Sequence, residues 1–408
     1  MILPRNLRTI IQDLRAEDWI RSLGHLGRVF MVGGCVRDGF RDAPIKDIDL
    51  IVEHTTMEAI KDILEPHGKV GIFGESFAVV KFTPHGHKGE PFDISVPRKD
   101  RKIGEGHKGF EIITEGVDIF GDLNRRDFTV NAIAVNVITG DLLDPFDGLA
   151  DLEIQTLRAV DASAFSEDPL RILRGVQFAA RFGFIIENET MIMMQNHASE
   201  IADVSGERIF DEFMKIIDKE GNTQIAANLI FETDVDLALF GKKMMDPTTG
   251  GWDHLDAISF FLLLGIFGDV EDPGQFVKKR LKGGKNLVKE ITILNHIYKQ
   301  LPIVGLYEEE LKLMLFKAFN KAPGVMEAAF LPEPAQDLVL EMRLCKVPMS
   351  EDDIQITGDN IKIIGNLDQG PEVGKIKEQI LRDALMNRFN WKEVAPALEH
   401  LKSLIWKD

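Results

Sequence analysis

The sequence has few cysteines, no long hydrophobic run and no excess of positive charge. Cys35 and Cys345 are the only cysteines in 408 residues, which excludes a disulfide framework and a cysteine-based zinc site. The longest apolar run, residues 258–267, is too short to span a bilayer and is interpreted as a buried core helix. The first residues carry charges throughout, without the apolar core of a signal peptide. These features predict an intracellular, cytoplasmic protein with no membrane partner.

The charge balance is acidic, with a formal net charge of −18. This argues against a nonspecific nucleic-acid binder, which is usually basic, but is compatible with a local basic tract. The densest such tract is KKRLKGGKNLVK, residues 278–289. It is either a nucleic-acid contact or a solvated helix end and loop. The length of the chain exceeds one average core and predicts two to four domains.

The hydrophobic pattern predicts an α+β fold, in which a small mixed-sheet part precedes a mostly α-helical part. The first 25 residues have the spacing of one amphipathic helix. Strand patterns and one helical pattern then follow as far as Gly148. The strands are expected within 28–34, 48–53, 77–84 and 92–97, and the helix within 57–68.

After Gly148 the strand signal fades and helical patterns dominate. Residues 167–184 and 205–217 are expected to be helices. Ser205 is a candidate N-cap of the second one. Arg208, Glu212 and Lys215 are expected on the solvent face of this second helix. No internal repeat or low-complexity tract is present.

The stretch KDIDLIVE, residues 46–53, carries two carboxylates in an otherwise apolar strand pattern. Asp47 and Asp49 are two residues apart, so on a strand both point to the same face. Such a pair favours a divalent metal site over a solvated strand end. Asp93, in the strand pattern FDIS, is either a third carboxylate of this site or an edge-strand surface residue. Three carboxylates on adjacent strands suit one or two magnesium ions, Mg²⁺.

Two glycines separate a strand pattern from a helical pattern in FMVGGCVRDGF. Gly33 and Gly34 would let a phosphate approach the backbone beside a helix N-terminus. Arg37 follows on the first helical turn, within reach of the same anion. A lone Gly-Gly-x-x-Arg is more often a simple turn, but the nearby acidic pair favours a phosphate site.

Four ordered motifs resemble those of the nucleotidyltransferase superfamily, specifically its class II tRNA branch of CCA-adding enzymes and poly(A) polymerases. They are GGCVRDGFRDAPIKDIDL, LNRRDFTVNAIA, EDPLRILRGVQFAARFGF and GERIFDEFMK, and together they cover roughly residues 26–217. The resemblance implies template-independent addition of C, C and A to the 3′ end of tRNA from CTP and ATP. It implies a catalytic head (1–148), a base-recognising neck (149–220), and a body and tail that bind the tRNA acceptor arm (221–408).

The resemblance also implies roles for the head residues. Asp47 and Asp49 would hold Mg²⁺, with Asp93 as a further catalytic carboxylate. Gly34 and Arg37 would bind the triphosphate, and Gly33 belongs to the same nucleotide-binding turn.

Arg125 and Arg126 would lie near the sugar or phosphates of the nucleotide, or one of them would instead form a structural ion pair with Asp127. Both alternatives are open from the sequence.

The neck motif implies base selection by Asp168 and Arg171, expected on one helix face at i and i+3. A carboxylate accepts from an exocyclic amino group and a guanidinium donates to a ring nitrogen. Cytosine and adenine offer both groups, whereas uracil and guanine present a carbonyl in place of the amino group. Without the resemblance, an ordinary helix-surface salt bridge would be preferred. Arg174 would contact nucleotide phosphates or hold the partner of Arg171.

The sequence departs from the family pattern in two respects. Gln177 stands where the family usually has an arginine, which leaves a triphosphate contact there in doubt. No His-Asp dipeptide occurs, and His254 and His296 are isolated, so the phosphohydrolase activity of many proteobacterial relatives is not expected.

The Gly- and Lys-rich tract 97–112 resembles a flexible loop of enzymes that add the complete CCA. It favours full CCA addition over a split CC- or A-adding activity, unless it is a surface loop without function. A bacterial poly(A) polymerase is the other enzyme considered, but such enzymes typically carry a basic C-terminal tail. A noncatalytic RNA-binding protein is disfavoured because both aspartates of the acidic pair are present.

Overall fold

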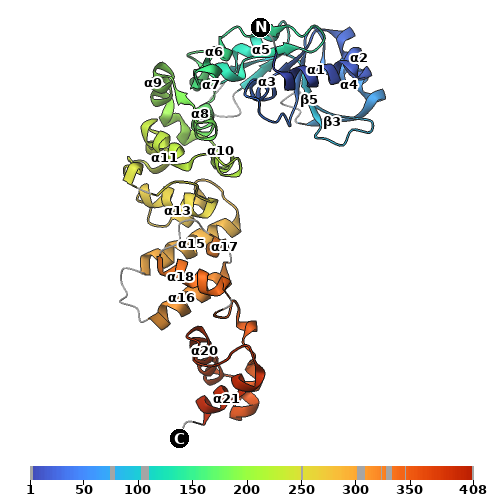
Figure 1. Ribbon diagram of the computed structural model, residues 1–408. Helices are drawn as coiled ribbons and strands as arrows, with labels where there is room; N and C mark the ends of the chain where they lie inside the picture. Colours follow the sequence, from blue (N-terminus) through green and yellow to red (C-terminus); the bar gives the residue numbers. More distant parts are fainter. Residues whose placement is uncertain are drawn as a thin grey trace. The chain divides into compact units, whose positions relative to one another are not determined.

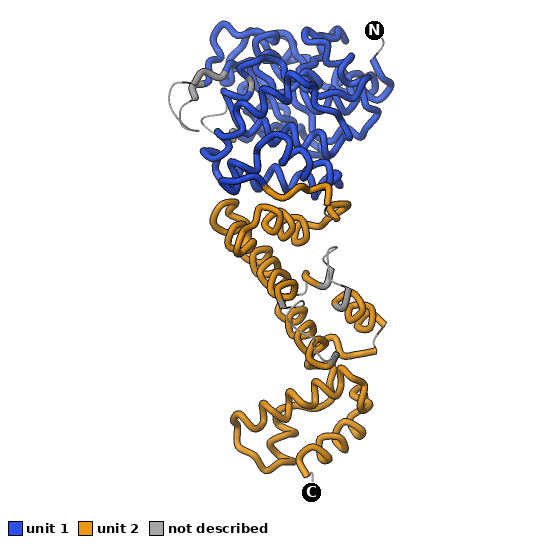
Figure 2. The backbone as a smooth tube through the Cα atoms, turned by 90° about the vertical axis from the view of Figure 1, so that its left-hand side faces the viewer, with its two compact units in different colours: residues 1–243 blue, residues 244–408 orange. Residues whose placement is uncertain are grey.

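The computed structural model describes residues 3–73, 79–102, 110–249, 251–300, 308–322, 324–327, 333–344 and 346–406. The chain divides into two compact units, Met1–Lys243 and Met244–Asp408 (Figure 2). Unit 1 contains all the motifs with candidate site residues. The finer division at residues 148 and 220 stays a prediction.

The N-terminal segment forms two helices, so the prediction of a single helix is wrong. α1 spans Arg5–Ala16 and α2 spans Asp18–Leu26. Glu17 between them has an extended backbone (ψ 132°), which interrupts the helical path. Each helix buries its apolar residues, and Trp19 of α2 is only 2% exposed. The break turns two separate apolar faces toward one core.

A seven-stranded mixed sheet forms the centre of unit 1, which confirms the predicted mixed-sheet head. Its order is β3-β4-β5-β2-β1-β8-β9. The strands are β1 Val29–Val32, β2 Asp49–Val52, β3 Gly68–Phe73, β4 Val79–Pro84, β5 Phe92–Ser95, β8 Ala134–Asn136 and β9 Leu142–Leu143. Only β2 and β5 pair in parallel, and the other neighbours are antiparallel. The parallel pair brings the first residues of β2 and β5 to the same edge of the sheet.

Two further strand pairs lie outside this sheet. They are β6 Lys99–Lys102 with β7 Phe110–Ile113, and β10 Thr156–Leu157 with β11 Ile185–Ile186.

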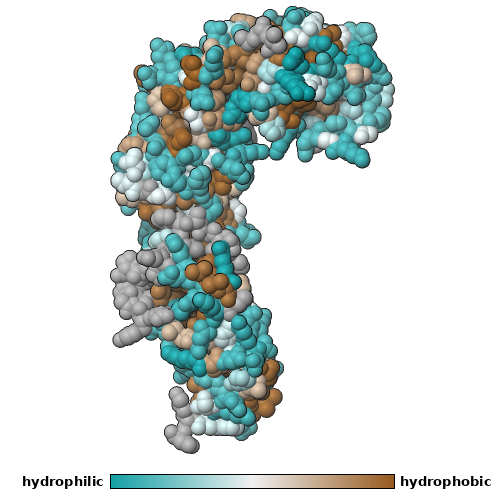
Figure 3. Space-filling view, viewed as in Figure 1, coloured by the Kyte–Doolittle hydropathy of each residue, from teal (hydrophilic) through white to brown (hydrophobic). Residues whose placement is uncertain are grey.

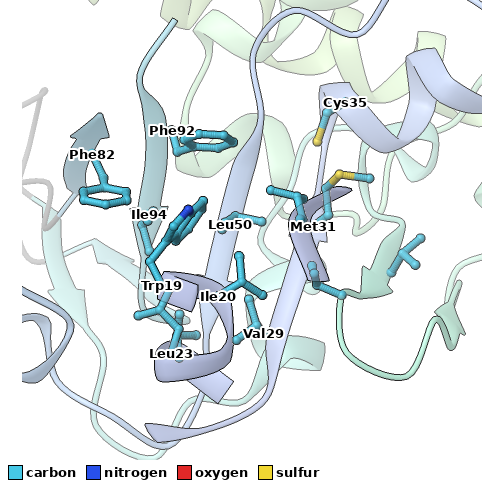
Figure 4. Close-up of a cluster of buried hydrophobic side chains, with 14 of the residues drawn as sticks. Trp19, Ile20, Leu23, Val29, Met31, Cys35, Leu50, Phe82, Phe92 and Ile94 are labelled. Atoms are coloured by element: carbon cyan, nitrogen blue, oxygen red, sulfur yellow. The ribbon is translucent and has the colours of Figure 1, made fainter. Parts of the chain in front are cut away.

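The main core lies between one face of the sheet and the helices α1, α2 and α4 (Met57–Leu64), which pack together (Figure 1). Trp19 fills its centre, with ring centroids 5.0 Å from Phe82 and 4.9 Å from Phe92 (Figure 4). Residues of opposite parity on β1 and β2 face a second cluster that includes α5, Ile119–Asn124. These two strands are therefore buried on both faces, which explains their continuous apolar sequence.

Helices make up most of the remainder of unit 1, as expected. They are α3 Gly34–Phe40, α6 Gly148–Glu153, α7 Ala164–Glu167, α8 Leu170–Phe182, α9 Asn188–His197, α10 Gly206–Asp218, α11 Thr223–Glu232 and α12 Val235–Phe240. Ser205 occupies the N-cap position of α10, but its side chain makes no capping hydrogen bond. Glu212 is only 3% exposed, so its predicted solvent-facing position is wrong. It turns inward as the partner of Lys215, at 2.8 Å.

Helices are the regular secondary structure of unit 2 in the residues that the structure describes. Its helices are α13 Ala257–Phe267, α14 Pro273–Lys279, α15 Lys285–Gln300, α16 Glu308–Lys321, α17 Gly324–Glu327, α18 Glu333–Arg343, α19 Gly358–Gly365, α20 Pro371–Leu385 and α21 Val394–Ile405. Most of α13 is buried, which confirms the predicted core helix in 258–267.

None of the described helices has the length and apolar character needed to cross a bilayer. Hydrophobic residues on the face drawn in Figure 3 form scattered patches among hydrophilic ones.

Candidate functional site

The turn between β1 and α3 is pressed against two charged side chains. Gly33 has a φ of +73°, in the region that favours glycine. A Cβ atom there would lie 2.7 Å from Nη1 of Arg126 and 3.8 Å from Oδ2 of Asp49. A side chain would therefore collide with the arginine, so the glycine is required both for the turn and for the close approach. The turn, Asp49 and Arg126 meet at one point, as the motifs predicted.

The two aspartates of the acidic pair do not share a strand, so that prediction is wrong. β2 begins at Asp49, and Asp47 is an exposed residue two positions earlier. The strand starts late because its hydrogen-bonded partner β1 ends at Val32, opposite Asp49. On the other side, Asp49 is the direct neighbour of Asp93 in the parallel pairing of β2 with β5.

Asp49 carries charge that its surroundings compensate poorly. Burial raises its pKa to about 6, with Asp93 and Asp47 adding to the rise and Arg126 opposing it. Within the described part of the chain, its carboxylate accepts no hydrogen bond and forms no ion pair. A divalent cation beside it would remove the repulsion. Asp47 and Asp49 supply the oxygen ligands that such a cation prefers, so the residues fit a metal.

Asp93 is already engaged by a lysine. Lys81 of β4 donates to both its oxygens, at 2.7 and 3.1 Å, and this hydrogen bonding raises the pKa of Lys81. Among the residues that the structure describes, no group of three or more His, Cys, Asp or Glu side chains is placed to hold a metal ion. A metal site at Asp47 and Asp49 stays a prediction, with Asp93 as the strand neighbour of Asp49.

Arg125 and Arg126 both pair with Asp122, a residue that the sequence reasoning missed. Their nearest distances to its carboxylate are 2.7 and 2.9 Å. The alternative that one of them pairs with Asp127 is therefore wrong. Burial alone would raise the pKa of Asp122, but Arg126 and Arg125 hold it below its usual range. Asp122 lies three and four residues before them, a helical spacing that was available as a signal.

Asp127 instead pairs with Arg174 of α8, at 2.7 Å. Its other oxygen accepts from the Asn131 side-chain amide at 2.9 Å. The Asn131 oxygen in turn accepts from Nη1 of Arg37 at 2.6 Å, and Arg37 also pairs with Asp38 at 2.8 Å. Arg37 is therefore buried and hydrogen-bonded rather than open to solvent. Asn131 is a second residue that the sequence reasoning missed, although it lies in a quoted motif.

Asp168 and Arg171 do not lie on one helix face, so that part of the prediction is wrong. α7 ends at Glu167 and α8 begins at Leu170, which leaves Asp168 in the break before Pro169. Arg208 of α10 donates to Oδ2 of Asp168 at 2.9 Å.

Arg171 is held from the other side. Its Nη2 donates to the backbone carbonyl of Arg125 at 2.6 Å, and its Nη1 lies 3.5 Å from Glu167. Neighbouring motifs thus fix the orientation of both side chains, Asp168 and Arg171.

Gln177 is buried and accepts hydrogen bonds from an arginine side chain. In the amide orientation that satisfies both groups, its oxygen accepts from Arg181 at 2.7 and 3.2 Å. The Gly- and Lys-rich tract 97–112 falls partly outside the described residues, since 103–109 are not described. Its proposed importance for complete CCA addition stays a prediction.

Comparisons with known proteins agree with the motifs. Residues 29–158 match the family model of the poly A polymerase head domain. Residues 183–235 match a model described as a probable RNA and SrmB-binding site of polymerase A. The head-domain family implies the use of a divalent metal.

Two curated relatives illustrate the sequence similarity. The multifunctional CCA protein of Stenotrophomonas maltophilia is 38% identical over 199 residues, or 47% of this chain and 46% of that protein. The CC-adding tRNA nucleotidyltransferase of Geobacter sulfurreducens is 37% identical over 258 residues, or 62% of this chain and 54% of that protein. The chain thus spans about half the length of the curated relatives it matches. These matches confirm the resemblance to class II CCA-adding enzymes.

Solved structures extend the similarity along the chain. The Bacillus stearothermophilus CCA-adding enzyme in complex with CTP has a TM-score of 0.70 and 22% identity, covering 95% of each chain. The Thermotoga maritima CCA-adding enzyme complexed with tRNA has a TM-score of 0.69 and 22% identity, covering 99% of this chain and 100% of that one. These structures show that the chain has their fold, a mixed-sheet head followed by helices.

The buried pair of Asp127 and Arg174 predicts a pH-dependent stability. Burial alone would raise the pKa of Asp127, but Arg174 and Asn131 hold it at about 2. Because the folded-state pKa is depressed, the stabilisation is present above the unfolded-state value of about 3.9 and is lost as the pH falls through about 2. The Asp127→Asn variant should lose about 2 kcal/mol of unfolding free energy at neutral pH.

Urea unfolding of wild type and variant from pH 7 to pH 2 measures this difference. Asp62→Asn, on the exposed side of α4, is the matched control and should leave the free energy of unfolding unchanged. A difference for Asp127→Asn that stays constant down to pH 2 would contradict the assignment.

Proposed function

We propose that the protein is a tRNA nucleotidyltransferase of the class II CCA-adding type. It adds C, C and A to the 3′ end of tRNA from CTP and ATP, without a nucleic-acid template, and releases pyrophosphate. The observation that carries this proposal is the meeting of Asp49, the Gly33 turn and Arg126 in a head that matches the poly A polymerase head domain. The cytoplasm as the place of action stays a prediction.

The head residues would hold a metal and the nucleotide phosphates. Asp47 and Asp49 would bind Mg²⁺, which when bound neutralises charge on the α-phosphate and lowers the pKa of the attacking 3′-hydroxyl. Asp93 belongs to this acidic group as the direct strand neighbour of Asp49. The triphosphate would approach the backbone at the Gly33 turn, beside the guanidinium group of Arg126.

The cations around that turn would orient the phosphates. Arg126 reaches the turn itself, while Gly34 begins the helix that carries Arg37. Arg125 fixes Asp122 and thereby supports Arg126. Preorganised donors of this kind need no rearrangement during the reaction.

Asp168 and Arg171 would replace a template by reading the incoming base. The carboxylate accepts from the amino group of cytosine or adenine, and the guanidinium donates to the ring nitrogen. Arg208 and the Arg125 carbonyl support this role by holding the two side chains in place. Arg174 would act through Asp127, since the two form an ion pair.

Unit 2 would bind the acceptor arm through RNA phosphates. The basic tract lies around the junction of α14 and α15 and carries five exposed lysines: Lys278, Lys279, Lys282, Lys285 and Lys289. Exposed lysines suit phosphate contacts, which position RNA by shape and charge more than by sequence. The Thermotoga maritima relative of the same fold is a complex with tRNA, which supports this partner.

A CC-adding enzyme is the second candidate. The Geobacter sulfurreducens relative, which bears that name, aligns over 62% of this chain, a larger share than the 47% of the Stenotrophomonas protein. A poly(A) polymerase is a further alternative because the head-domain model covers such enzymes.

Addition to tRNA transcripts ending before the CCA, after one C and after two Cs separates these functions. With CTP alone, the first transcript should gain two cytidines, and with ATP alone only the third should gain one adenosine. Failure of the third transcript to accept ATP would leave a CC-adding enzyme. Repeated adenosine addition without any cytidine addition would establish a poly(A) polymerase and contradict the proposal.

The base-reading role predicts a selectivity change in Arg171→Ala. Loss of the ring-nitrogen donor should reduce discrimination of C and A against U and G by roughly tenfold or more. Incorporation of each nucleotide in competition measures the ratio. Arg21→Ala, at an exposed arginine of α2 that contacts Asp18 and the backbone carbonyl of Arg15, is the control and should keep the wild-type ratio. A slower variant with unchanged selectivity would exclude the template role of Arg171.

A further inference from the structure

Three guanidinium groups surround one aromatic ring at the C-terminal end of α8. The Phe182 ring centroid lies 4.7 Å from the Cζ atom of Arg37, 3.9 Å from that of Arg41 and 4.9 Å from that of Arg181. Phe178, one turn earlier, stacks on Phe182 with a centroid distance of 5.8 Å and an interplanar angle of 11°. The two rings form an aromatic base beneath the arginines.

The acidic groups near this cluster do not balance its charge. Asp38 pairs with Arg37 at 2.8 Å and lies 3.7 Å from Arg41. Arg181 is hydrogen-bonded to neutral Gln177, and the acidic groups that act on it are Asp38, which is shared with Arg37 and Arg41, and Glu212, which pairs with Lys215. An excess of positive charge is thus concentrated at one place in a protein whose net charge is −18.

Burial and mutual repulsion act against the charged form of Arg41 and Arg181, while Asp38 favours it. Burial lowers the pKa of Arg41 and of Arg181, and repulsion from Arg37 lowers both further. Both side chains nevertheless remain partly exposed. A planar guanidinium presents paired donors that match the oxygens of a phosphate, and a bound phosphate would relieve the repulsion.

The cluster adjoins the candidate site, but a phosphate group bound at the Gly33 turn would not reach Arg41. Arg37 is linked through Asn131 to Arg126, since Arg126 donates to the Asn131 carbonyl at 3.3 Å. Gly33 is the N-cap residue of α3 and Arg41 is its C-cap residue. A helix of this length separates its ends by roughly 10 Å. A triphosphate bound at the Gly33 turn would therefore leave Arg41 free for a different phosphate.

We propose that Arg41 and Arg181, on the platform of Phe182, bind a backbone phosphate of the RNA substrate next to the reaction site. The inference rests on the proposed function for the identity of the RNA. Its ligand chemistry, a phosphate group, could come from the RNA or from the incoming nucleotide. The two sources are separated by measuring RNA affinity and nucleotide KM independently.

The test uses the full chain and the double variant Arg41→Gln with Arg181→Gln. Its affinity for a tRNA transcript lacking the CCA end should fall roughly tenfold or more, with a weaker dependence on salt concentration. The KM for CTP should stay unchanged. The midpoint of thermal unfolding should stay equal or rise, because like-charge crowding is removed. The double variant Arg5→Gln with Arg8→Gln, at two exposed arginines of α1, removes the same two charges elsewhere and should change none of these quantities.

Three outcomes would overturn the proposal, and a fourth would overturn only the proposed function. Unchanged RNA affinity and salt dependence would exclude the site. A raised KM for CTP with unchanged RNA affinity would assign the phosphate to the nucleotide. A loss of RNA affinity accompanied by a lower unfolding midpoint would reduce the cluster to a structural role. If the wild type binds RNA in the expected manner but adds no nucleotide, the proposed function fails while the phosphate site stands.

Discussion

The repulsion among carboxylates at the start of β2 is the constraint on which the candidate site depends. Asp49 begins a strand that is buried on both faces, and the one parallel pairing of the sheet fixes it beside Asp93. The backbone cannot carry these groups apart without breaking the sheet. Lys81 pairs with Asp93, whereas Asp49 lies beside Arg126 and the Gly33 turn and forms no ion pair among the described residues. The fold thus leaves one carboxylate in need of a cation, next to a turn that a phosphate can approach.

The second organising element is a series of buried polar contacts that joins the sheet to the helices after it. Buried charges destabilise a fold unless each is paired, so such a series holds its members in fixed positions. Asp122 holds the two arginines beside the turn, and Asp127 and Asn131 connect that region to α8. The two proposed base-reading side chains are then held from α10 and from the head backbone. The proposed metal, phosphate and base positions are connected through these contacts, which would suit an enzyme without a template.

Local signals in the sequence were sufficient for the fold class, for the four strands β1, β2, β4 and β5, and for the meeting of Gly33 with Asp49. The break before α8 was also readable, because the residue preceding Pro169 is disfavoured in a helix. The late start of β2 and the break at Glu17 depend on strand pairing and packing across the core, which no local pattern contains. The grouping of arginines around Phe182 is likewise absent from any local pattern, since Arg41 and Arg181 lie at the ends of two helices far apart in the sequence. The motif resemblance implied roles for the candidate site residues. Their hydrogen-bond and ion-pair partners became clear only from the three-dimensional arrangement.

Direct titration with Mn²⁺ in the absence of nucleotide, followed by the electron paramagnetic resonance signal of the free ion, tests the central claim. Mn²⁺ prefers the same oxygen ligands as Mg²⁺ and reports binding without any need for activity. The wild type should bind the ion, and Asp49→Asn should bind it at least about tenfold more weakly, as expected when one charged ligand is lost. Asp62→Asn, which removes an exposed carboxylate from α4, should match the wild type. Equal Mn²⁺ affinity in wild type and Asp49→Asn would contradict a metal site at the start of β2.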